Sequence, residues 1–477
     1  MTLKISMLCW VFLLGFAADA EAQKVVVSEE IPIRAEDYFN IIGQVEDRVV
    51  LMTIKNQKVE AFSYDQEMRL RNSTALDLLN RNSRIIGTLH SPSHFYIFTQ
   101  FQKGQEQHII KWKYNERLQL ADSATVAIAS QMTGYSQFLM THSEDQSKTL
   151  FFRTDNNVNL QAFCWDLDNE SVMWTKNFQL EGNIRQEFRK MLLSNTGVMT
   201  AVLEKRDRRF RRTGMNFEFA VYTGSGDSPR IYQIEESDID NFSNQIIFDD
   251  HRNEIVGAGL YYSRSSTRAD GHYHFRIGLD GTGKQKFEYL PFTAAMLTDV
   301  SAQNINRQGI PEIETRDVLL TRDGGLVVFS EVEKVYERRP VYSQRGWGRN
   351  YGQAGWVDYQ LEDVIITAFS PDGSVHWHEV IYKKQYSQDD GAVHSSYFIF
   401  KSPSFLRILY NDEISNNSTV SEFILAANGV SERKNLLNTA YQNLRLRFED
   451  ALQLSSQTLI VPSENKARLN LVKIHFD

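Results

Sequence analysis

The chain has 477 residues, of which 42% are hydrophobic and 23% charged, with 26 glycines and 9 prolines. This composition excludes a disordered, collagen-like or disulfide-stapled small protein and suffices for a large hydrophobic core. The formal net charge of -8 at pH 7 argues against a nucleic-acid-binding protein, because such proteins need a basic surface to neutralise phosphates.

The first 22 residues have the three parts of a secretory signal peptide. Lys4 supplies a positive charge, an apolar stretch follows from Ile5 to Ala18, and small residues lead to a cleavage site after Ala22. At about 1.5 Å per helical residue, the apolar stretch is shorter than the ~30 Å hydrocarbon core of a membrane. We therefore predict an exported protein, periplasmic or extracellular, with no lipid anchor and no transmembrane segment. Cleavage would leave Cys164 as a single cysteine, for which we expect an inert, buried thiol.

A repeated pattern runs through the mature chain. In each copy, a large apolar residue stands three positions before a turn-forming aspartate or asparagine. The copies end at Asp65, Asn115, Asp166, Asp280, Asp372 and Asn428, with a degenerate copy at Gly224. These positions are nearly evenly spaced except between 280 and 372, which indicates a tandem repeat with one long interruption.

Each repeat contains four short runs of β-branched and aromatic residues, separated by residue pairs that favour hairpin turns. Repeats of this length with four antiparallel strands are typical of a β-propeller, whose radially stacked sheets bury both faces. The burial of both faces explains why Val364–Phe369 lacks polar alternation.

The two ends of the chain are expected to close the propeller. The last repeat has three convincing strands, between Asp450 and Phe476, whereas Lys24–Val27 is a lone strand at the mature N-terminus. Pairing this strand with the last repeat would remove two open sheet edges. We predict an all-β, single-domain propeller over residues 23–477 with eight blades, seven being the alternative.

The long interval holds two insertions. Residues Phe292–Glu314 form an excursion between blades, with a short helix predicted at Ala294–Val300. Residues 335–361 lie between the second and third strands of the sixth repeat and are rich in Tyr, Trp, Arg and Gly, which is typical of a binding loop. The candidate binding residues in this loop are Tyr342, Arg345, Trp347, Arg349, Tyr351 and Trp356. The alternative is a hairpin tip whose aromatic side chains fold back onto the blade.

A second candidate site is the basic run from Lys205 to Arg212 in the fourth repeat, a local reversal of sign in an acidic protein. Its candidate residues are Arg208, Arg209, Arg211 and Arg212. The run would dock on an anionic polymer, lipid headgroups or an acidic protein. The alternative is a charged hairpin tip that serves only solubility.

Two segments, 165–174 and 369–377, carry a turn followed by a tryptophan, at Trp174 and Trp377. They resemble the turn-plus-tryptophan element of pyrroloquinoline-quinone-type and related bacterial propellers, in which the tryptophan packs between adjacent blades. The chain as a whole resembles secreted bacterial β-propeller proteins of unassigned function. This resemblance implies a fold and a location rather than a reaction.

No linear motif predicts a metal, a cofactor or a catalytic residue. The sequence contains no nucleophile elbow, metalloprotease helix or phosphate-binding glycine loop. Two histidine pairs each occupy one face of a strand, namely His272 with His274 and His376 with His378. Without further ligands, each pair is expected on an ordinary exposed strand face rather than in a metal site.

The leading interpretation is an exported, non-enzymatic propeller that binds a protein or a glycan through one rim. The alternative is a propeller enzyme, either a glycoside hydrolase or lyase or a quinone-dependent oxidoreductase, with its site at the central channel. Such a site would draw residues from several blades and leave no linear motif. Convergent charged groups with shifted pKa values at the channel mouth favour the enzyme, whereas a bland channel favours the binder.

Overall fold

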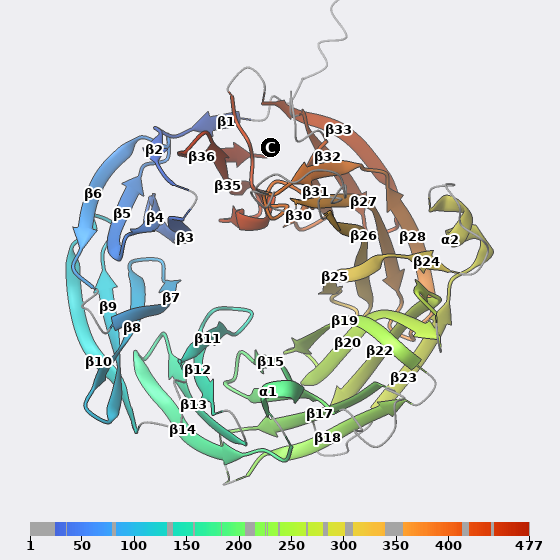
Figure 1. Cartoon of the computed structure of the whole chain (residues 1–477), viewed down its shortest axis with the longest axis horizontal. Helices are drawn as coiled ribbons and strands as arrows, with labels where there is room; N and C mark the ends of the chain where they lie inside the picture. The colour runs from blue at the N-terminus through green and yellow to red at the C-terminus, as the bar shows by residue number, and fades with distance from the viewer. Residues whose placement is uncertain are drawn as a thin grey trace, which may run out of the picture.

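Most of the predicted repeats fold as four-stranded antiparallel sheets in the computed structural model of the protein (Figure 1). The structure describes residues 24–34, 36–78, 83–130, 137–155, 158–182, 184–205, 215–224, 226, 228–236, 239–263, 266–279, 285–300, 309–338, 356–412, 419–439 and 443–476. The described strands form eight blades around a common centre, which confirms the predicted β-propeller and its blade count.

The first four blades follow one another in simple meander order. Blade 1 contains β3 (Tyr38–Val45), β4 (Arg48–Lys55), β5 (Lys58–Tyr64) and β6 (Leu70–Leu76). Blade 2 contains β7 (Ser83–His90), β8 (Phe95–Lys103), β9 (Glu106–Tyr114) and β10 (Leu120–Ser130). Blade 3 contains β11 (Leu139–His142), β12 (Lys148–Thr154), β13 (Asn159–Asp166) and β14 (Ser171–Gln179). Blade 4 follows the short helix α1 (Ile184–Glu187) and contains β15 (Phe188–Leu193), β16 (Met199–Glu204), β17 (Met215–Tyr222) and β18 (Arg230–Glu236).

Blades 5 to 7 carry the additional segments. Blade 5 contains β19 (Ile239–Asp249), β20 (Glu254–Ser263), β22 (Gly271–Gly278) and β23 (Gln285–Pro291). Between blades 5 and 6 lie α2 (Ala294–Asp299) and a small sheet of β21 (Arg268–Ala269) and β24 (Ile310–Pro311). Blade 6 contains β25 (Ile313–Leu320), β26 (Leu326–Arg338), β27 (Trp356–Phe369) and β28 (Val375–Ile381), with β29 (Gln385–Gln388) added to β27. Blade 7 contains β30 (Phe398–Lys401), β31 (Phe405–Asn411), β32 (Thr419–Ala426) and β33 (Ser431–Asn438). The predicted short helix is therefore confirmed as α2.

Blade 8 is built from both ends of the described chain, as predicted. It contains β34 (Leu452–Gln453), which follows the 3-10 helix η2 (Phe448–Asp450), then β35 (Thr458–Asn465), β36 (Arg468–His475) and β1 (Lys24–Val27). In the antiparallel register of β1 and β36, Lys24 lies opposite His475 and Val27 opposite Val472. The short strand β2 (Ile31–Pro32) also pairs with β36 and leads the chain into blade 1.

The hydrophobic core is a ring of layers, each shared by two neighbouring blades. Between blades 8 and 1, for example, Leu469 and Leu471 pack with Val49, Leu51 and Phe62. Comparable clusters join each of the remaining pairs of neighbouring blades around the ring. Each blade therefore buries both faces, which is the reason for the continuous apolar strands in the sequence.

The repeated aspartate or asparagine has a local structural role in the turn between the third and fourth strands. Asp65 Oδ1 accepts hydrogen bonds from the backbone N–H groups of Glu67 at 3.0 Å and Arg69 at 2.9 Å. Short polar side chains stabilise tight turns in this way. The same role falls to Asn115, Asp166, Asp372 and Asn428, whereas Asp280 lies outside the described residues.

The two repeat tryptophans contact the next blade. Trp174 of blade 3 donates its indole N–H to the Gly197 carbonyl of blade 4 at 3.2 Å, and Trp377 of blade 6 donates to the Ala427 carbonyl of blade 7 at 2.9 Å. These contacts link neighbouring blades near their outer edges. No helix in the described part of the chain has the length and apolar character needed to span a membrane.

Candidate functional site

A pocket of about 490 Å³ is lined by β25, β26 and β27 of blade 6, by β30 and the segment before it in blade 7, and by η2 before blade 8. We call it the upper pocket. Its polar and tyrosine lining consists of Arg316, Asp317, Glu333, Tyr359, Ser396, Tyr397, Lys401 and Glu449. Its remaining lining consists of Leu319, Leu361, Gly391, Ala392, Phe398, Ile399 and Phe448. The volume falls within the ~300–1,000 Å³ range of small-molecule sites.

Propeller topology explains why these residues meet. Arg316 and Asp317 belong to β25, the inner strand of blade 6, whereas Glu333 and Tyr359 belong to the far ends of β26 and β27. In an antiparallel blade, the start of the first strand and the hairpin between the second and third strands point to the same end. The segments before β30 and β34 reach this end from blades 7 and 8.

A buried ion pair supports the upper pocket from within blade 6. The side chains of Glu331 and Lys383 are completely buried, with Lys383 Nζ 2.5 Å from Glu331 Oε1. Ser396 Oγ donates a hydrogen bond to the other carboxylate oxygen at 2.8 Å, and Lys383 donates to Gln385 Oε1 at 2.8 Å. Burial lowers the pKa of Lys383, an effect that the Glu331 carboxylate opposes. Such a pair holds its position firmly because either charge alone would be very unfavourable there.

Arg316 is held in place by two carboxylates. Its Nε lies 3.3 Å from Glu331 Oε2, and its Nη2 lies 2.5 Å from Glu333 Oε2. Burial opposes the charge on Arg316, but Glu331 and Glu333 outweigh this effect and raise its pKa. The guanidinium group is therefore fixed and charged, and a third of the side chain remains exposed toward the pocket.

Two carboxyl groups of the upper pocket titrate above their usual range. Tyr397 donates its hydroxyl to Asp317 Oδ2 at 2.9 Å. Burial raises the pKa of Asp317, and this hydrogen bond opposes the shift only in part. Burial also raises the pKa of Glu333, against the opposing charge of Arg316. Groups with shifted pKa values in a concave site are typical of functional sites, because they exchange protons closer to neutral pH.

Of the six candidate binding residues in the predicted 335–361 loop, only Trp356 lies among the described residues. Trp356, the first residue of β27, is half-buried and lies opposite Arg338, the last residue of β26. Tyr342, Arg345, Trp347, Arg349 and Tyr351 lie outside the described residues, as do Arg208, Arg209, Arg211 and Arg212 of the basic run. Strands β26 and β27 extend well into the predicted loop, so only residues 339–355 separate them.

The prediction that His272 and His274 lie on an exposed strand face was wrong. Both side chains are buried between blades 5 and 6, where His272 Nε2 lies 3.0 Å from Thr367 Oγ1 and His274 Nε2 lies 3.1 Å from Glu288 Oε2. A strand face in a propeller is covered by the neighbouring blade, so it is not exposed by default.

Among the described residues, no group of three His, Cys, Asp or Glu side chains is arranged to hold a metal ion. Cys164 is buried as expected, and burial raises the pKa of its thiol to about 12.

Apart from Tyr359 and Leu361, which lie within the predicted 335–361 loop, sequence reasoning missed the residues of the upper pocket. Arg316, Asp317 and Glu333 lie on two strands that look like ordinary blade strands, and Tyr397 lies in a later repeat. No local spacing connects them, because their proximity depends on how blades 6, 7 and 8 pack. The one available signal was the presence of charged residues in otherwise apolar strands, such as Glu331 in β26.

No protein-family model matches the chain, and no curated protein matches it in sequence. Among solved structures, it is similar to an uncharacterized protein from Listeria monocytogenes, with 7% identity over 80% of this chain and 90% of that one and a TM-score of 0.40. It is also similar to the β-propeller domain of the Trilobed protease from Pyrococcus furiosus, with 12% identity over 84% and 98% and a TM-score of 0.36. An oligogalacturonate lyase in complex with manganese shows 9% identity over 95% and 98% and a TM-score of 0.36. Our assignment of the fold rests on the strand pairing itself.

Proposed function

We propose that this protein is an exported propeller that binds a carbohydrate in the upper pocket. The observation that carries the proposal is the convergence of tyrosine rings and fixed charged groups at one mouth of the ring. Tyr359 offers an aromatic surface to the apolar face of a sugar, while Arg316 and Asp317 offer hydrogen bonds to its hydroxyl groups. The signal-peptide features of residues 1–22 support export.

The composition of residues 339–355 supports a contribution of this segment to the same site. Its flanking residues Arg338 and Trp356 belong to the two strands that carry Glu333 and Tyr359 into the upper pocket. Tyrosine, tryptophan and arginine side chains give a large contact area at low entropic cost. We therefore include residues 339–355 in the proposal as a candidate contributor to the binding of an oligosaccharide.

A glycoside hydrolase or lyase is the second candidate, because the upper pocket contains Asp317 and Glu333 with raised pKa values. A carboxyl group with a raised pKa can donate a proton to a leaving oxygen, while a second carboxylate acts as base or nucleophile. Charged residues that converge in this way are expected of a propeller enzyme, and they are not expected of a channel lined by uncharged residues.

Calorimetric titration of the mature protein with neutral and acidic oligosaccharides tests the proposal. We expect binding that Tyr359→Ala and Asp317→Asn each weaken at least tenfold, or about 1.4 kcal/mol. Tyr289→Ala is the control, because this exposed tyrosine lies on the outer strand of blade 5. Saccharide binding that both pocket variants leave unchanged, or no saccharide binding at all, would contradict the proposal.

The same samples distinguish a binder from an enzyme. If the bound oligosaccharide is recovered intact after prolonged incubation, the protein is a binder. If it is cleaved, we expect Asp317→Asn and Glu333→Gln to abolish cleavage while they retain part of the binding, because the amides preserve the shape of the pocket and lose its acid–base chemistry.

A further inference from the structure

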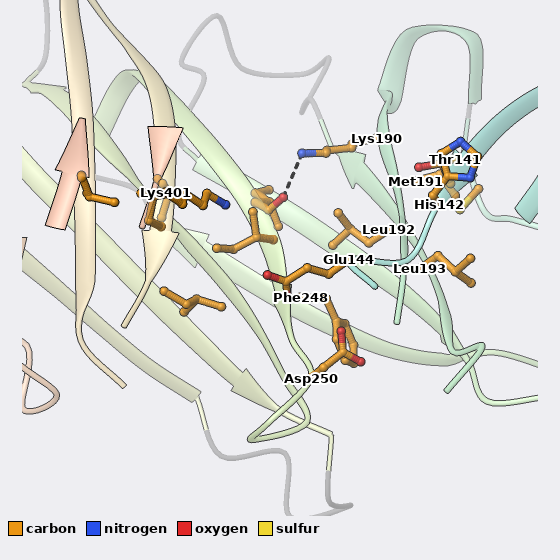
Figure 2. A pocket seen from close by; sticks show the side chains of 16 residues that line it. Thr141, His142, Glu144, Lys190, Met191, Leu192, Leu193, Phe248, Asp250 and Lys401 are labelled. Carbon is orange, nitrogen blue, oxygen red and sulfur yellow. Dashed lines mark hydrogen bonds between the residues drawn. The ribbon is translucent and has the colours of Figure 1, made fainter. Parts of the chain in front are cut away.

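A second pocket, of about 470 Å³, lies at the opposite end of the inner strands and is shown in Figure 2. We call it the lower pocket. It is formed where β11, β15, β19 and β25 end, together with Lys401 of β30 and Leu406 of β31. Leu319 and Lys401 line both pockets, so the two adjoin within the ring.

The middle of the lower pocket is apolar. Ile247, Phe248 and Leu320 are only partly buried and present side-chain surface to the cavity, together with the more buried Leu192. Apolar side chains that remain in contact with water gain free energy when a ligand covers them, by roughly 25 cal/mol per Å². This wall therefore favours an apolar body in the ligand.

Two ammonium groups lie on the inner side of the apolar wall. Lys190 lies within β15 and donates a hydrogen bond to the Ile246 carbonyl at 3.1 Å, and Lys401 reaches inward far enough to line the upper pocket as well. Among the described residues, no salt bridge to a carboxylate involves Lys190, whereas the charge of Lys401 acts on the Asp317 carboxyl of the upper pocket and lowers its pKa in part. Burial lowers the pKa of Lys190, and no carboxylate opposes this effect. An anionic group bound here would gain charge-assisted hydrogen bonds.

The outer rim of the lower pocket is acidic. Glu144 belongs to the turn after β11, and Asp250 directly follows β19, so both lie at the turn end of the blades. Figure 2 shows Asp250 and Lys190 at opposite sides of the pocket. Asp250 accepts a hydrogen bond from the Asn195 N–H at 2.7 Å. Burial raises its pKa, and the nearby Glu144, Asp145 and Asp249 add to the shift. A cationic group at this rim would relieve the repulsion among these carboxylates.

We propose that the lower pocket binds a short apolar peptide with free ends. Its carboxylate would lie at Lys190 and Lys401, its side chains against Leu192, Phe248 and Leu320, and its amino group at Glu144 and Asp250. The arrangement of charges favours this ligand, because the lysines match its carboxylate and the acidic residues match its amino group. A fatty acid would satisfy the lysines but leave the acidic rim unpaired, and an alkylamine would do the reverse.

Chemical variants of one ligand test this assignment. The mature protein is titrated by calorimetry with a leucine-containing apolar tripeptide, with its N-acetylated and C-amidated forms, and with decanoate. We expect each blocked peptide to bind at least fivefold more weakly than the free one. Decanoate binding as tight as that of the free tripeptide, or no tripeptide binding at about 1 mM, would overturn the proposal.

Protein variants assign each end of the peptide. Lys190→Ala should weaken binding of the free tripeptide at least fivefold but have little effect on the amidated form, since the amide has no carboxylate to pair. Glu144→Gln should likewise weaken the free form but not the acetylated form. Lys58→Ala, an exposed lysine of blade 1, is the matched control. Equal effects of Lys190→Ala on both peptides would contradict the assignment.

Tyr359→Ala should leave tripeptide binding unchanged, so failure here is distinguishable from failure of the carbohydrate proposal.

Discussion

Histidines packed between the blades are expected to make the stability of the whole protein depend on pH. Burial, with a smaller contribution from the neighbouring His274, lowers the pKa of His272 to about 4, against a hydrogen bond with the Gly259 backbone. His142 has a pKa of about 4 for the same main reason. The native state thus keeps these rings neutral, whereas in the unfolded chain they have pKa values of about 6.5.

The sign of the pH dependence follows from this difference. Below about pH 6.5 the unfolded chain binds protons that native His272 does not bind, so stability is lost as the pH falls from about 6.5 toward 4. We expect His272→Gln to reduce this loss, because glutamine can keep a hydrogen bond to Thr367 and does not titrate. Thermal unfolding at a series of pH values measures the effect. His376→Gln, the same replacement at an exposed position, is the control. Identical profiles for both variants would show that His272 does not contribute.

At the scale of elements, the β26–β27 hairpin connects the blade core to the upper pocket. Its strands pair from Leu326 opposite Phe369 to Arg338 opposite Trp356, and β29 adds a further strand to the distal part of β27. Glu333 lies opposite Leu361 on this hairpin, and both line the pocket. The described part of the hairpin is thus held together by its own ladder and by β29.

Replacing residues 339–355 with Asn-Gly tests their role. Arg338 and Trp356 lie directly opposite each other, and an Asn-Gly pair closes such a register as a two-residue hairpin turn. We expect the midpoint of thermal unfolding to stay within about 4 °C, while oligosaccharide binding falls at least tenfold. Calorimetry and thermal unfolding on the same sample give both values. Unchanged binding would show that the upper pocket suffices without this segment.

At the scale of the whole molecule, closure of the ring depends on a few residues of the N-terminal strand. β1 covers the edge of β36, and Ser28 extends this contact through hydrogen bonds between its backbone N–H and the Leu471 carbonyl and between its side chain and the Leu471 N–H. Without β1, the apolar edge of β36 would be open to pairing with other chains.

Removal of residues 24–28 should therefore lower stability and promote association. We expect a decrease in the midpoint of thermal unfolding of several degrees, together with oligomers in size-exclusion chromatography, because the open edge of β36 can pair with another copy. Substitution of Lys24 by alanine is the control, since it keeps the backbone ladder intact. A shortened chain that stays monomeric and equally stable would show that the last blade closes without β1.

The sequence alone was sufficient for the architecture. The Asp and Asn turn residues such as Asp65 and the apolar strands are local features, which act through bonds to residues nearby or through burial on both faces. The strand Lys24–Val27 is also recognisable locally, although it pairs with β36 at the other end of the chain. The β-propeller and its closure by β1 follow from these features, whereas the structure decided between eight blades and the alternative of seven. Local patterns predict local structure well because the same turn chemistry and strand burial are repeated in each blade.

Only the tertiary structure decided where the candidate sites lie. Arg316 and Tyr397 of the upper pocket, and Lys190 and Lys401 of the lower pocket, come from segments far apart in the chain. Burial likewise depends on what the neighbouring blade covers, which is why His272 proved to be inside the ring of blades rather than on its surface. The physical reason is that pKa shifts and pockets arise from desolvation and from charges brought together across blades, and neither quantity is carried by a short stretch of sequence.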